Sequence, residues 1–329
     1  MSFADKQVLI TGGAGFIGSN IAIRLAGLGA HVTVLDSMLP GYGGNLFNLE
    51  PVRDSISINF SDMRDPHSLS YIVQGKDYIF NLAGQVSHQD SMVDPLMDME
   101  INVRAQLVLL EACRSYNPGA VIVYSSTRQF YGSPEYLPVD ELHPINPPDV
   151  NGINKLAGEQ YHTLYSRVHG LKTVSLRLTN TYGPHLLIKN ARQGFIGWFI
   201  NRAVTGNEIQ LFGGGEQIRD FNHVDDVVDA FLIAATTPEC YGNYYNLSGE
   251  KSSLYDVARS LMEFGGTGTV VCIPFPEERK KIDIGNFWGC SDKFSRTTGW
   301  QTAVSLQSGL KSTYGFYSRN SHHYLEESS

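Results

Sequence analysis

The feature that most constrains the fold of this chain is a glycine-rich turn close to its start. An apolar run, Val8-Leu9-Ile10-Thr11, leads into Gly12-Gly13-Ala14-Gly15-Phe16-Ile17-Gly18. Apolar residues then recur at helical spacing as far as Leu28, which predicts a helix after the turn. Glycine permits a sharp turn, a close approach of the backbone to a phosphate and tight packing of a helix on its strand. The pattern therefore predicts a strand, a turn and a helix whose N-terminus receives a pyrophosphate.

A second predicted strand indicates which dinucleotide this turn would bind. His31-Val32-Thr33-Val34-Leu35 ends on Asp36, about where an acid accepts the ribose hydroxyls of an adenosine. A carboxylate there repels a ribose 2′-phosphate, so the sequence favours NAD over NADP. The alternative is a structural glycine turn in another kind of α/β protein. The predicted cofactor contacts are Gly12, Gly15, Phe16, Ile17, Gly18, Asp36, Asp62, Met63, Leu82, Ala83 and Gly84.

Composition restricts the class of protein and its partners. The chain has 329 residues, of which 42 % are hydrophobic and 18 % charged, and its formal net charge is −8. It can therefore bury a sizeable core and suits neither nucleic acid nor an anionic membrane as a partner. Cys113, Cys240, Cys272 and Cys290 lack the paired spacing of a zinc or redox site, and no apolar run approaches the ~20 residues of a membrane span. The first predicted strand begins too close to the start of the sequence to leave room for a signal peptide, so we expect a cytoplasmic protein. We expect no metal site.

The order of apolar segments predicts the fold class. Strands alternate with helices through the first half of the chain, which indicates an α/β fold with a doubly wound parallel sheet of Rossmann type. After residue 178 the regular alternation of predicted strands and helices ends, and the pattern predicts a smaller C-terminal lobe that binds the substrate. The expected strands are at 56–60, 78–82, 121–124 and 173–177, with short strands near 270–290, and the expected helices are at 95–116, 151–170, 224–235 and 252–264.

These segments suggest a division of the chain. Residues 1–178 form the predicted NAD-binding domain, to which a strand at 220–226 and the helix at 224–235 return. Residues 179–315 form mainly the substrate lobe. The polar residues 316–329 are expected to be a frayed tail.

Taken together, the motifs resemble the extended short-chain dehydrogenase/reductase family, which contains the NAD-dependent nucleotide-sugar epimerases and dehydratases. The resemblance covers about residues 1–315. Segments 82–86 and 193–199 look most similar to CDP-paratose 2-epimerases, and UDP-sugar 4-epimerases look somewhat less close. The motifs that carry the resemblance are Thr11 to Gly18, Asp36, Asn81-Leu82-Ala83-Gly84, Ser125-Ser126-Thr127 with Tyr131-Gly132, Asn180 to Pro184, and Arg219-Asp220-Phe221.

The resemblance implies a function and its partners. It implies transient oxidation of a sugar hydroxyl by tightly held NAD, a nucleotide-diphosphate sugar as substrate, and a homodimer built on the helices near 95–116 and 151–170. Thr127 matches the family's serine or threonine that bonds the reacting hydroxyl, and Lys155 matches the lysine that holds the nicotinamide ribose. The implied substrate contacts are His88, Arg128, Asn180, Arg219, Lys280 and Asp283.

One position departs from the family pattern. The family places a catalytic tyrosine four residues before the lysine, on the same helical face, and here Asn151 precedes Lys155. A phenolate can take the hydroxyl proton while hydride leaves the same carbon, whereas an amide cannot act as a base near pH 7. Three interpretations stay open: a substitute acid/base, a disabled or non-catalytic relative that binds NAD and a nucleotide sugar, and an engineered loss of the tyrosine.

The candidates for a substitute base, and the reaction they would serve, also follow from the motifs. Arg128 and Gln129 stand where 4,6-dehydratases of the family have an acidic pair, so that reaction is disfavoured, and a dehydratase with a substitute base remains an alternative. The candidate bases are Tyr131, His88, Tyr182 and His185. The predicted catalytic residues are Thr127, Lys155, Asn151 and Tyr131.

Overall fold

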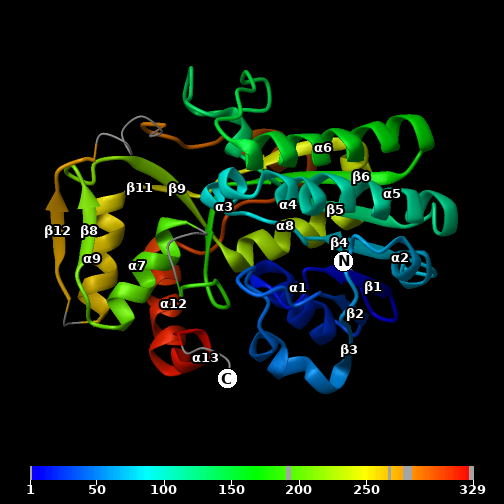
Figure 1. Ribbon diagram of the computed structural model, residues 1–329, viewed down its shortest axis with the longest axis horizontal. Coiled ribbons are helices and arrows are strands. Elements are labelled where there is room, and N and C mark those ends of the chain that lie inside the picture. The colour runs from blue at the N-terminus through cyan, green and yellow to red at the C-terminus, as the bar shows by residue number, and fades with distance from the viewer. Residues whose placement is uncertain (1, 190–193, 266–267, 277–283, 326–329) are drawn as a thin grey trace.

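A parallel sheet of seven strands forms the larger part of the molecule (Figure 1). The computed structural model describes residues 2–189, 194–265, 268–276 and 284–325. The strand order is β10-β6-β5-β4-β1-β2-β3, and each neighbouring pair is parallel. The predicted doubly wound α/β fold is therefore confirmed. The strands are β1 (Gln7–Thr11), β2 (His31–Leu35), β3 (Ile56–Asn59), β4 (Tyr78–Asn81), β5 (Val121–Thr127), β6 (Lys172–Leu178) and β10 (Asn243–Leu247).

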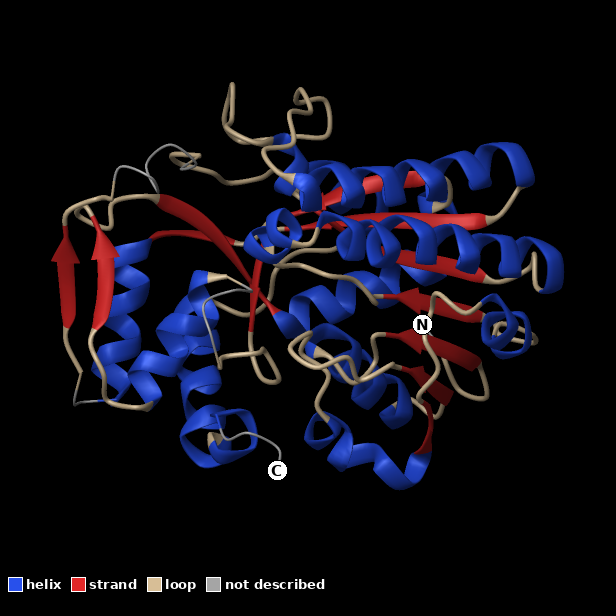
Figure 2. Cartoon of the chain, in the orientation of Figure 1, coloured by secondary structure: helices blue, strands red, loops and turns tan. Residues whose placement is uncertain are grey.

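Helices cover both faces of this sheet because its strands are apolar on both sides (Figure 2). Val8 and Ile10 of β1 pack into one core with α1 (Phe16–Gly27) and α8 (Val224–Thr236). Leu9, between them in the chain, faces a second core with the opposite helices. Alternating side chains of a strand point to opposite faces, so both must be covered. The helices of that second face are α2 (Pro66–Ile72), α5 (Ala105–Tyr116) and α6 (Val150–His169).

The predicted helix over 95–116 is present but interrupted. It consists of α4 (Pro95–Met99), a π-helical turn η2 (Glu100–Arg104) and α5, and it follows the short helix α3 (His88–Val93). Asn102 lies in the π turn, is fully buried, and exchanges hydrogen bonds with the backbone of Gln85. A π turn often occurs where a helix must aim a side chain at a site. Here it fixes the segment that follows β4.

The smaller lobe has its own core of aromatic and aliphatic side chains. Its three-stranded sheet has the order β11-β9-β7, and two further strands, β8 and β12, pair in parallel. The lobe is formed by β7 (Asn180–Tyr182), α7 (Phe195–Val204), β8 (Ile209–Phe212), β9 (Ile218–His223), β11 (Glu250–Ser253), α9 (Leu254–Gly265), β12 (Val270–Ile273) and α12 (Leu306–Asn320). The remaining elements are η1 (Leu46–Ser55), η3 (Gln129–Tyr131), η5 (Pro238–Cys240), α11 (Asp292–Thr298) and α13 (His322–Leu325).

One expectation about how the chain returns to the main sheet is wrong. The predicted strand at 220–226 is β9, and it pairs with β7 and β11 instead of returning to the main sheet. The strand that does return is β10, which pairs with β6. The helix at 224–235 returns as predicted, because the apolar face of α8 packs on the main sheet.

The tail is also ordered further than the sequence predicts. Residues 316–325 belong to α12 and α13, and Tyr317 and Tyr324 are buried. The Tyr324 hydroxyl donates to Asn48 Oδ1 at 2.6 Å. Aromatic burial therefore outweighs the polar composition of this segment as far as residue 325, and the last four residues of the tail, 326–329, lie outside the described chain. No helix in the described ranges combines the length and apolar character that a membrane crossing requires.

Candidate active site

One cleft of about 350 Å³ lies at the carboxyl ends of the main strands, where ligands bind in open α/β sheets. Gly12 follows β1, Asp36 follows β2 and Leu82 follows β4, so the topology gathers segments that are distant in sequence. Leu186 and Phe195 of the smaller lobe also line it. Every predicted cofactor residue lines this cleft: Gly12, Gly15, Phe16, Ile17, Gly18, Asp36, Asp62, Met63, Leu82, Ala83, Gly84 and Lys155.

The glycine turn leaves no room for side chains. Gly12 has a φ of +66°, and a Cβ there would lie 2.8 Å from the backbone nitrogen of Ala83. A Cβ at Gly18 would collide with the carbonyl oxygen of Gly12. No side chain caps the first turn of α1. Bare backbone and an uncapped helix N-terminus together fit the diphosphate of a dinucleotide.

Asp36 lies next to the glycine turn and lines the same cleft. Its Oδ2 accepts from the backbone nitrogen of Ala14 and its Oδ1 from that of Met38, both at 3.0 Å. Burial raises the pKa of the Asp36 carboxyl, and these two hydrogen bonds oppose the rise. Each carboxylate oxygen can accept a second bond. Asp36 therefore fits the pair of ribose hydroxyls that the sequence predicts for it.

Asp62 lines the cleft with its carboxylate already paired. Arg64 Nη2 donates to Asp62 Oδ2 at 2.6 Å, and this hydrogen bond lowers the pKa of the Asp62 carboxyl. The predicted contact of Asp62 with an adenine amino group would have to share that carboxylate with Arg64.

The predicted catalytic residues Thr127, Asn151 and Lys155 line the same cleft. Thr127 ends β5, and its Oγ1 accepts from the backbone nitrogen of Gln129 at 3.1 Å. Lys155 extends from α6, and its Nζ donates to the carbonyl oxygen of Ser125 at 2.6 Å. Burial lowers the pKa of Lys155 to about 8, although the charge of Asp98 opposes this. Lys155 therefore has ammonium hydrogens to offer near neutral pH.

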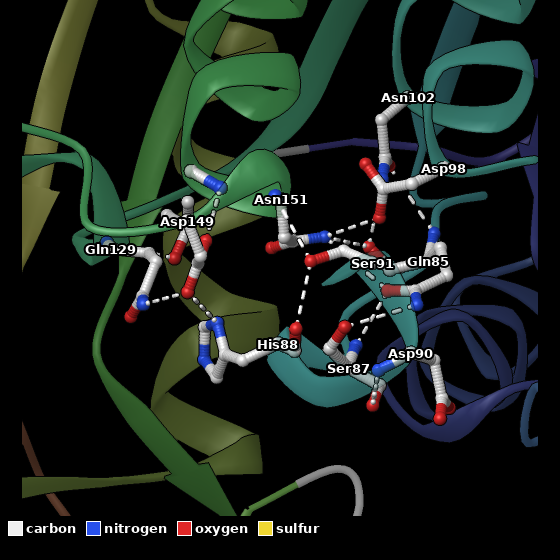
Figure 3. Close-up of polar contacts among 12 residues, drawn as sticks. Gln85, Ser87, His88, Asp90, Ser91, Asp98, Asn102, Gln129, Asp149 and Asn151 are labelled. Atoms are coloured by element: carbon white, nitrogen blue, oxygen red, sulfur yellow. Dashed lines mark hydrogen bonds and ion pairs between the residues drawn. The ribbon is translucent and has the colours of Figure 1, made fainter. Parts of the chain in front are cut away.

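Asn151 is embedded in a network of buried polar groups (Figure 3). Its Nδ2 donates to the carbonyl oxygen of Gln85 at 2.8 Å and to Asp98 Oδ2 at 3.0 Å. Asn154 Nδ2 donates to the other Asp98 oxygen at 2.7 Å. Asp98 is 1 % exposed and Asn151 3 %, so these hydrogen bonds satisfy groups that water cannot reach.

The predicted substrate residues His88, Arg128 and Asn180 also line the cleft. The guanidinium carbon of Arg128 lies 4.5 Å from the centre of the Phe287 ring. Burial and, to a smaller extent, the charge of Arg219 together lower the pKa of Arg128 to about 10. Arg128 stays a cation at neutral pH, and a phosphate would relieve both effects.

The other predicted substrate residues are not seen in the lining of the cleft, and two of them lie outside the part of the chain that the structure describes. Arg219 is buried but does not line it, and its Nη1 donates to the carbonyl oxygens of Ile218 and Gly285. Its charge acts on the cleft through its neighbour Arg128. Lys280 and Asp283 lie outside the described residues.

The role predicted for Tyr131 is wrong on geometry. Tyr131 is 1 % exposed and does not line the cleft. Its hydroxyl donates to Asn246 Oδ1 at 2.8 Å and accepts from Arg177. Burial raises the pKa of this phenol, which opposes its use as a base. Tyr131 is a packing residue that connects η3, β6 and β10.

Two further candidate bases are also enclosed. The Tyr182 hydroxyl donates to the carbonyl oxygen of Leu306 at 3.4 Å, and His185 Nδ1 lies 2.9 Å from Ser19 Oγ. Both residues are buried and neither lines the cleft.

Sequence reasoning missed two acidic residues beside Asn151. Asp98 is the buried acceptor described above, and Asp149 is the N-cap of α6, whose Oδ1 accepts from the backbone nitrogen of Gly152 at 2.8 Å. Asp149 had a readable signal, because an aspartate just before a predicted helix is a typical N-cap. Asp98 had none, because its partners come from a different helix.

The comparisons with known proteins agree with this geometry. The model of the NAD dependent epimerase/dehydratase family matches residues 8–248. The chain belongs to this family. NAD is accordingly its cofactor, and the bare glycine turn and Asp36 are the groups that would hold it.

Relatives match over nearly the whole chain. A putative UDP-glucose 4-epimerase of Methanocaldococcus jannaschii is 31 % identical, over 95 % of this chain and 99 % of that protein. A CDP-paratose 2-epimerase of Salmonella typhi is 29 % identical over the same shares. The structure of Thermotoga maritima UDP-glucose 4-epimerase with UDP-glucose superposes with a TM-score of 0.86 at 30 % identity, covering 95 % of this chain and 99 % of that one. The resemblance to these epimerases is therefore confirmed.

Asp36 gives the first testable prediction. Asp36→Ala is expected to weaken NAD binding by about 1–3 kcal/mol, because two ribose hydroxyls lose a charged acceptor. Binding of NADP is expected to weaken less or to improve, because the like charge beside its 2′-phosphate is gone. Calorimetric titration of the parent protein and of Asp36→Ala with NAD and with NADP measures these affinities. Equal affinity of the parent protein for NAD and NADP would contradict the role of Asp36.

Proposed function

We propose that this protein is an NAD-dependent nucleotide-sugar epimerase, which oxidises one hydroxyl of its sugar transiently and re-reduces the ketone. The observation that carries the proposal is one cleft that the dinucleotide residues line together with Thr127, Lys155 and Arg128. The named activities of the similar proteins support the same class of reaction. NAD, when bound, supplies the acceptor and the later donor of hydride, so it is regenerated in each turnover.

The chain's own residues divide the remaining work. Lys155, fixed by Ser125 and adjoining Gly84, would hold the ribose next to the nicotinamide. Thr127 Oγ1 keeps its own hydrogen, because its bond to Gln129 uses a lone pair, and it can donate to the reacting oxygen. Arg128 would pair with the diphosphate, and Asn180 would contact the phosphate or the sugar.

Asn151 does not supply the proton acceptor of this reaction. An amide is neutral near pH 7, and both hydrogens of its Nδ2 point to acceptors in the buried network. The fit of Asn151 to Asp98 and Gln85 supports a site built around asparagine, with the base elsewhere.

Turnover of nucleotide sugars tests the proposal. The protein with NAD is expected to convert at least one member of a panel of UDP-, CDP- and GDP-sugars to an epimer, which chromatography and NMR detect. NADH absorbance at 340 nm is expected to remain small, because the cofactor is regenerated. Binding of the panel without conversion of any member would instead favour the non-catalytic alternative.

The affinity for the diphosphate gives a second prediction. Arg128→Ala is expected to weaken binding of the nucleoside diphosphate by about 1.5–3 kcal/mol, the usual value of a hydrogen bond to a charged group. NAD binding is expected to change little. Calorimetry with UDP, CDP and NAD measures both affinities, and exposed Arg259 of α9 offers a control as Arg259→Ala. Equal losses for both ligands would indicate a structural role.

We propose further that the protein is a cytoplasmic homodimer. The described cysteines are all unpaired, as expected in a reducing compartment. Tyr116 at the end of α5 and Val168 near the end of α6 are 55 % and 59 % exposed, and burial of such apolar side chains against a second copy would be favourable. The sedimentation coefficient distinguishes the dimer from the monomer.

A further inference from the structure

We propose that His88, positioned by Asp149, is the acid and base of this site and takes the place of the absent tyrosine. The inference rests on the proposed epimerase activity, since that reaction requires a group that takes a proton from a sugar hydroxyl and returns it. Four side chains are candidates from the sequence, and all four lie in the described part of the chain. His88 alone among them lines the cleft; the others are Tyr131, Tyr182 and His185.

His88 is held in place at the start of α3. Ser91 Oγ donates to the carbonyl oxygen of His88 at 2.8 Å and accepts from the backbone nitrogen of Asn151 at 3.2 Å. The first turn of α3 is thereby attached to the first turn of α6, the helix that carries Lys155 (Figure 3). The His88 side chain is 48 % exposed, so its ring is accessible from the cleft while its backbone is fixed.

Asp149 determines which ring nitrogen of His88 is available. Its Oδ2 lies 3.0 Å from His88 Nδ1 and accepts from Gln129 Nε2 at 2.8 Å. Burial alone would raise the pKa of the Asp149 carboxyl, but the hydrogen bonds from His88 and Gly152 hold it below its usual value. An ionised Asp149 requires a donor at Nδ1, so the proton of the neutral ring resides there and Nε2 carries the lone pair. An aspartate orients the catalytic histidine of hydrolytic triads in the same way.

Asn151 completes the arrangement as an acceptor. Because its nitrogen faces Asp98 and Gln85, its carbonyl oxygen faces the opposite side, toward Asp149 and His88 (Figure 3). A sugar hydroxyl that Thr127 touches could donate to this oxygen, which orients the hydroxyl without taking its proton. Asn151 and Asp149 are positioning residues, and His88 is the group that would exchange the proton.

The proposed step balances. In the oxidation, the sugar O–H bond breaks and its proton passes to Nε2 of His88. As the C–H bond of the same carbon breaks and a C=O double bond forms, NAD held by the glycine turn, Asp36 and Lys155 would supply the acceptor for the hydrogen and its electron pair. The resulting imidazolium donates from Nδ1 to the Asp149 carboxylate, which stabilises its charge. In the reduction, the proton returns from Nε2 to the oxygen as hydride is added back to the carbon.

Replacement of the ring tests this directly. His88→Asn keeps an N–H group near the position of Nδ1, and so a partner for Asp149, but removes Nε2. We expect kcat to fall about 10²–10⁴-fold, with KM and the calorimetric affinity for UDP or CDP unchanged. The matched control is His67→Asn, because His67 is an exposed histidine of α2 outside the cleft, and its kcat is expected to match that of the parent.

Asp149→Asn tests the positioning role. Asparagine also caps a helix, so α6 is expected to keep its first turn while the carboxylate is lost. We expect a fall in kcat between those of the parent and His88→Asn, with little change in KM. Added imidazole is expected to restore part of the turnover of His88→Ala, whereas it cannot replace a merely structural side chain.

A measurement independent of turnover uses the ¹⁵N spectrum of histidine-labelled protein, in which His88→Asn assigns the resonance. The expected signal is a neutral ring protonated at Nδ1, and Asp149→Asn is expected to shift the ring toward a mixture of tautomers. A parent that converts no nucleotide sugar overturns the proposed function and with it the catalytic role of His88. A parent that converts one, with His88→Asn equally fast or with Nε2 carrying the proton, overturns the role of His88 alone.

Discussion

Replacement of Glu159 by alanine is expected to lower the free energy of unfolding by about 3–5 kcal/mol. Glu159 on α6 and Arg177 on β6 are 0 % and 1 % exposed, and Arg177 Nη2 donates to Glu159 Oε1 at 2.6 Å. Ser126 Oγ donates to the other carboxylate oxygen at 2.6 Å. Alanine would leave the Arg177 guanidinium buried without its counter-charge, and the loss of that partner is what makes such a substitution costly.

The cost is expected to be specific to the buried pair. The matched control is Glu100→Ala, because Glu100 and Arg104 form an exposed pair at 3.1 Å on one helix, for which about 0.5 kcal/mol or less is expected. In the double variant Glu159→Leu with Arg177→Met, both charges are absent, so much of the stability is expected to return. Urea unfolding followed by circular dichroism measures all three. A change below 1 kcal/mol for Glu159→Ala would mean that water or another group reaches Arg177.

This ion pair also explains why the segments that carry Thr127 and Lys155 lie next to each other. Ser126 precedes Thr127 on β5, and Glu159 lies one turn after Lys155 on α6. A buried contact between those neighbours fixes the strand end against the helix. The Tyr131 hydroxyl accepts a hydrogen bond from the same guanidinium. It therefore stabilises the packing around the ion pair and is not available as a base.

The cofactor half of the cleft is easier to predict from the sequence than the substrate half, because several of its residues lie close together in one stretch of the chain. Gly12, Gly18 and Asp36 are set by backbone requirements of one strand-turn-helix-strand unit, and such requirements are legible as residue type and spacing. The main strands were predictable for a similar reason, since continuous apolar runs indicate strands buried on both faces. The exception is β10, whose sequence Asn-Tyr-Tyr-Asn-Leu lacks such a run.

The substrate half depends on contacts that no local pattern encodes. Asp149 contacts His88, which lies 61 positions away in the sequence, and Asp98 contacts Asn151, which lies 53 positions away. The burial of Tyr324 against Asn48 joins residues 276 positions apart. Polar residues at such positions look like solvated turns or tails in the sequence, and only tertiary packing shows that they are enclosed.

Asn151→Tyr is expected to destabilise the protein by roughly 2–6 kcal/mol without increasing turnover. A phenol is larger than an amide at a site that is 3 % exposed, and overpacking of this kind costs about 1–3 kcal/mol. The substitution also removes the donor to Asp98 Oδ2, and leaving one buried acceptor unsatisfied costs about 1–3 kcal/mol more. The control is Ile153→Tyr on the same helix, where the side chain is 55 % exposed and a change within about 0.5 kcal/mol is expected.

The same variant separates a substitute base from a loss of the base, whether that loss is natural or engineered. If the base is His88, the phenol occupies the place of the Asn151 oxygen that orients the hydroxyl, and epimer formation stays flat or falls. If the site is merely disabled, a phenol one turn from Lys155 restores proton transfer and turnover rises about 10²–10⁴-fold. Epimer formation by the parent, Asn151→Tyr and the double variant Asn151→Tyr with His88→Asn decides between them. A gain that persists in the double variant would return the base to α6, because the phenol then works without the imidazole.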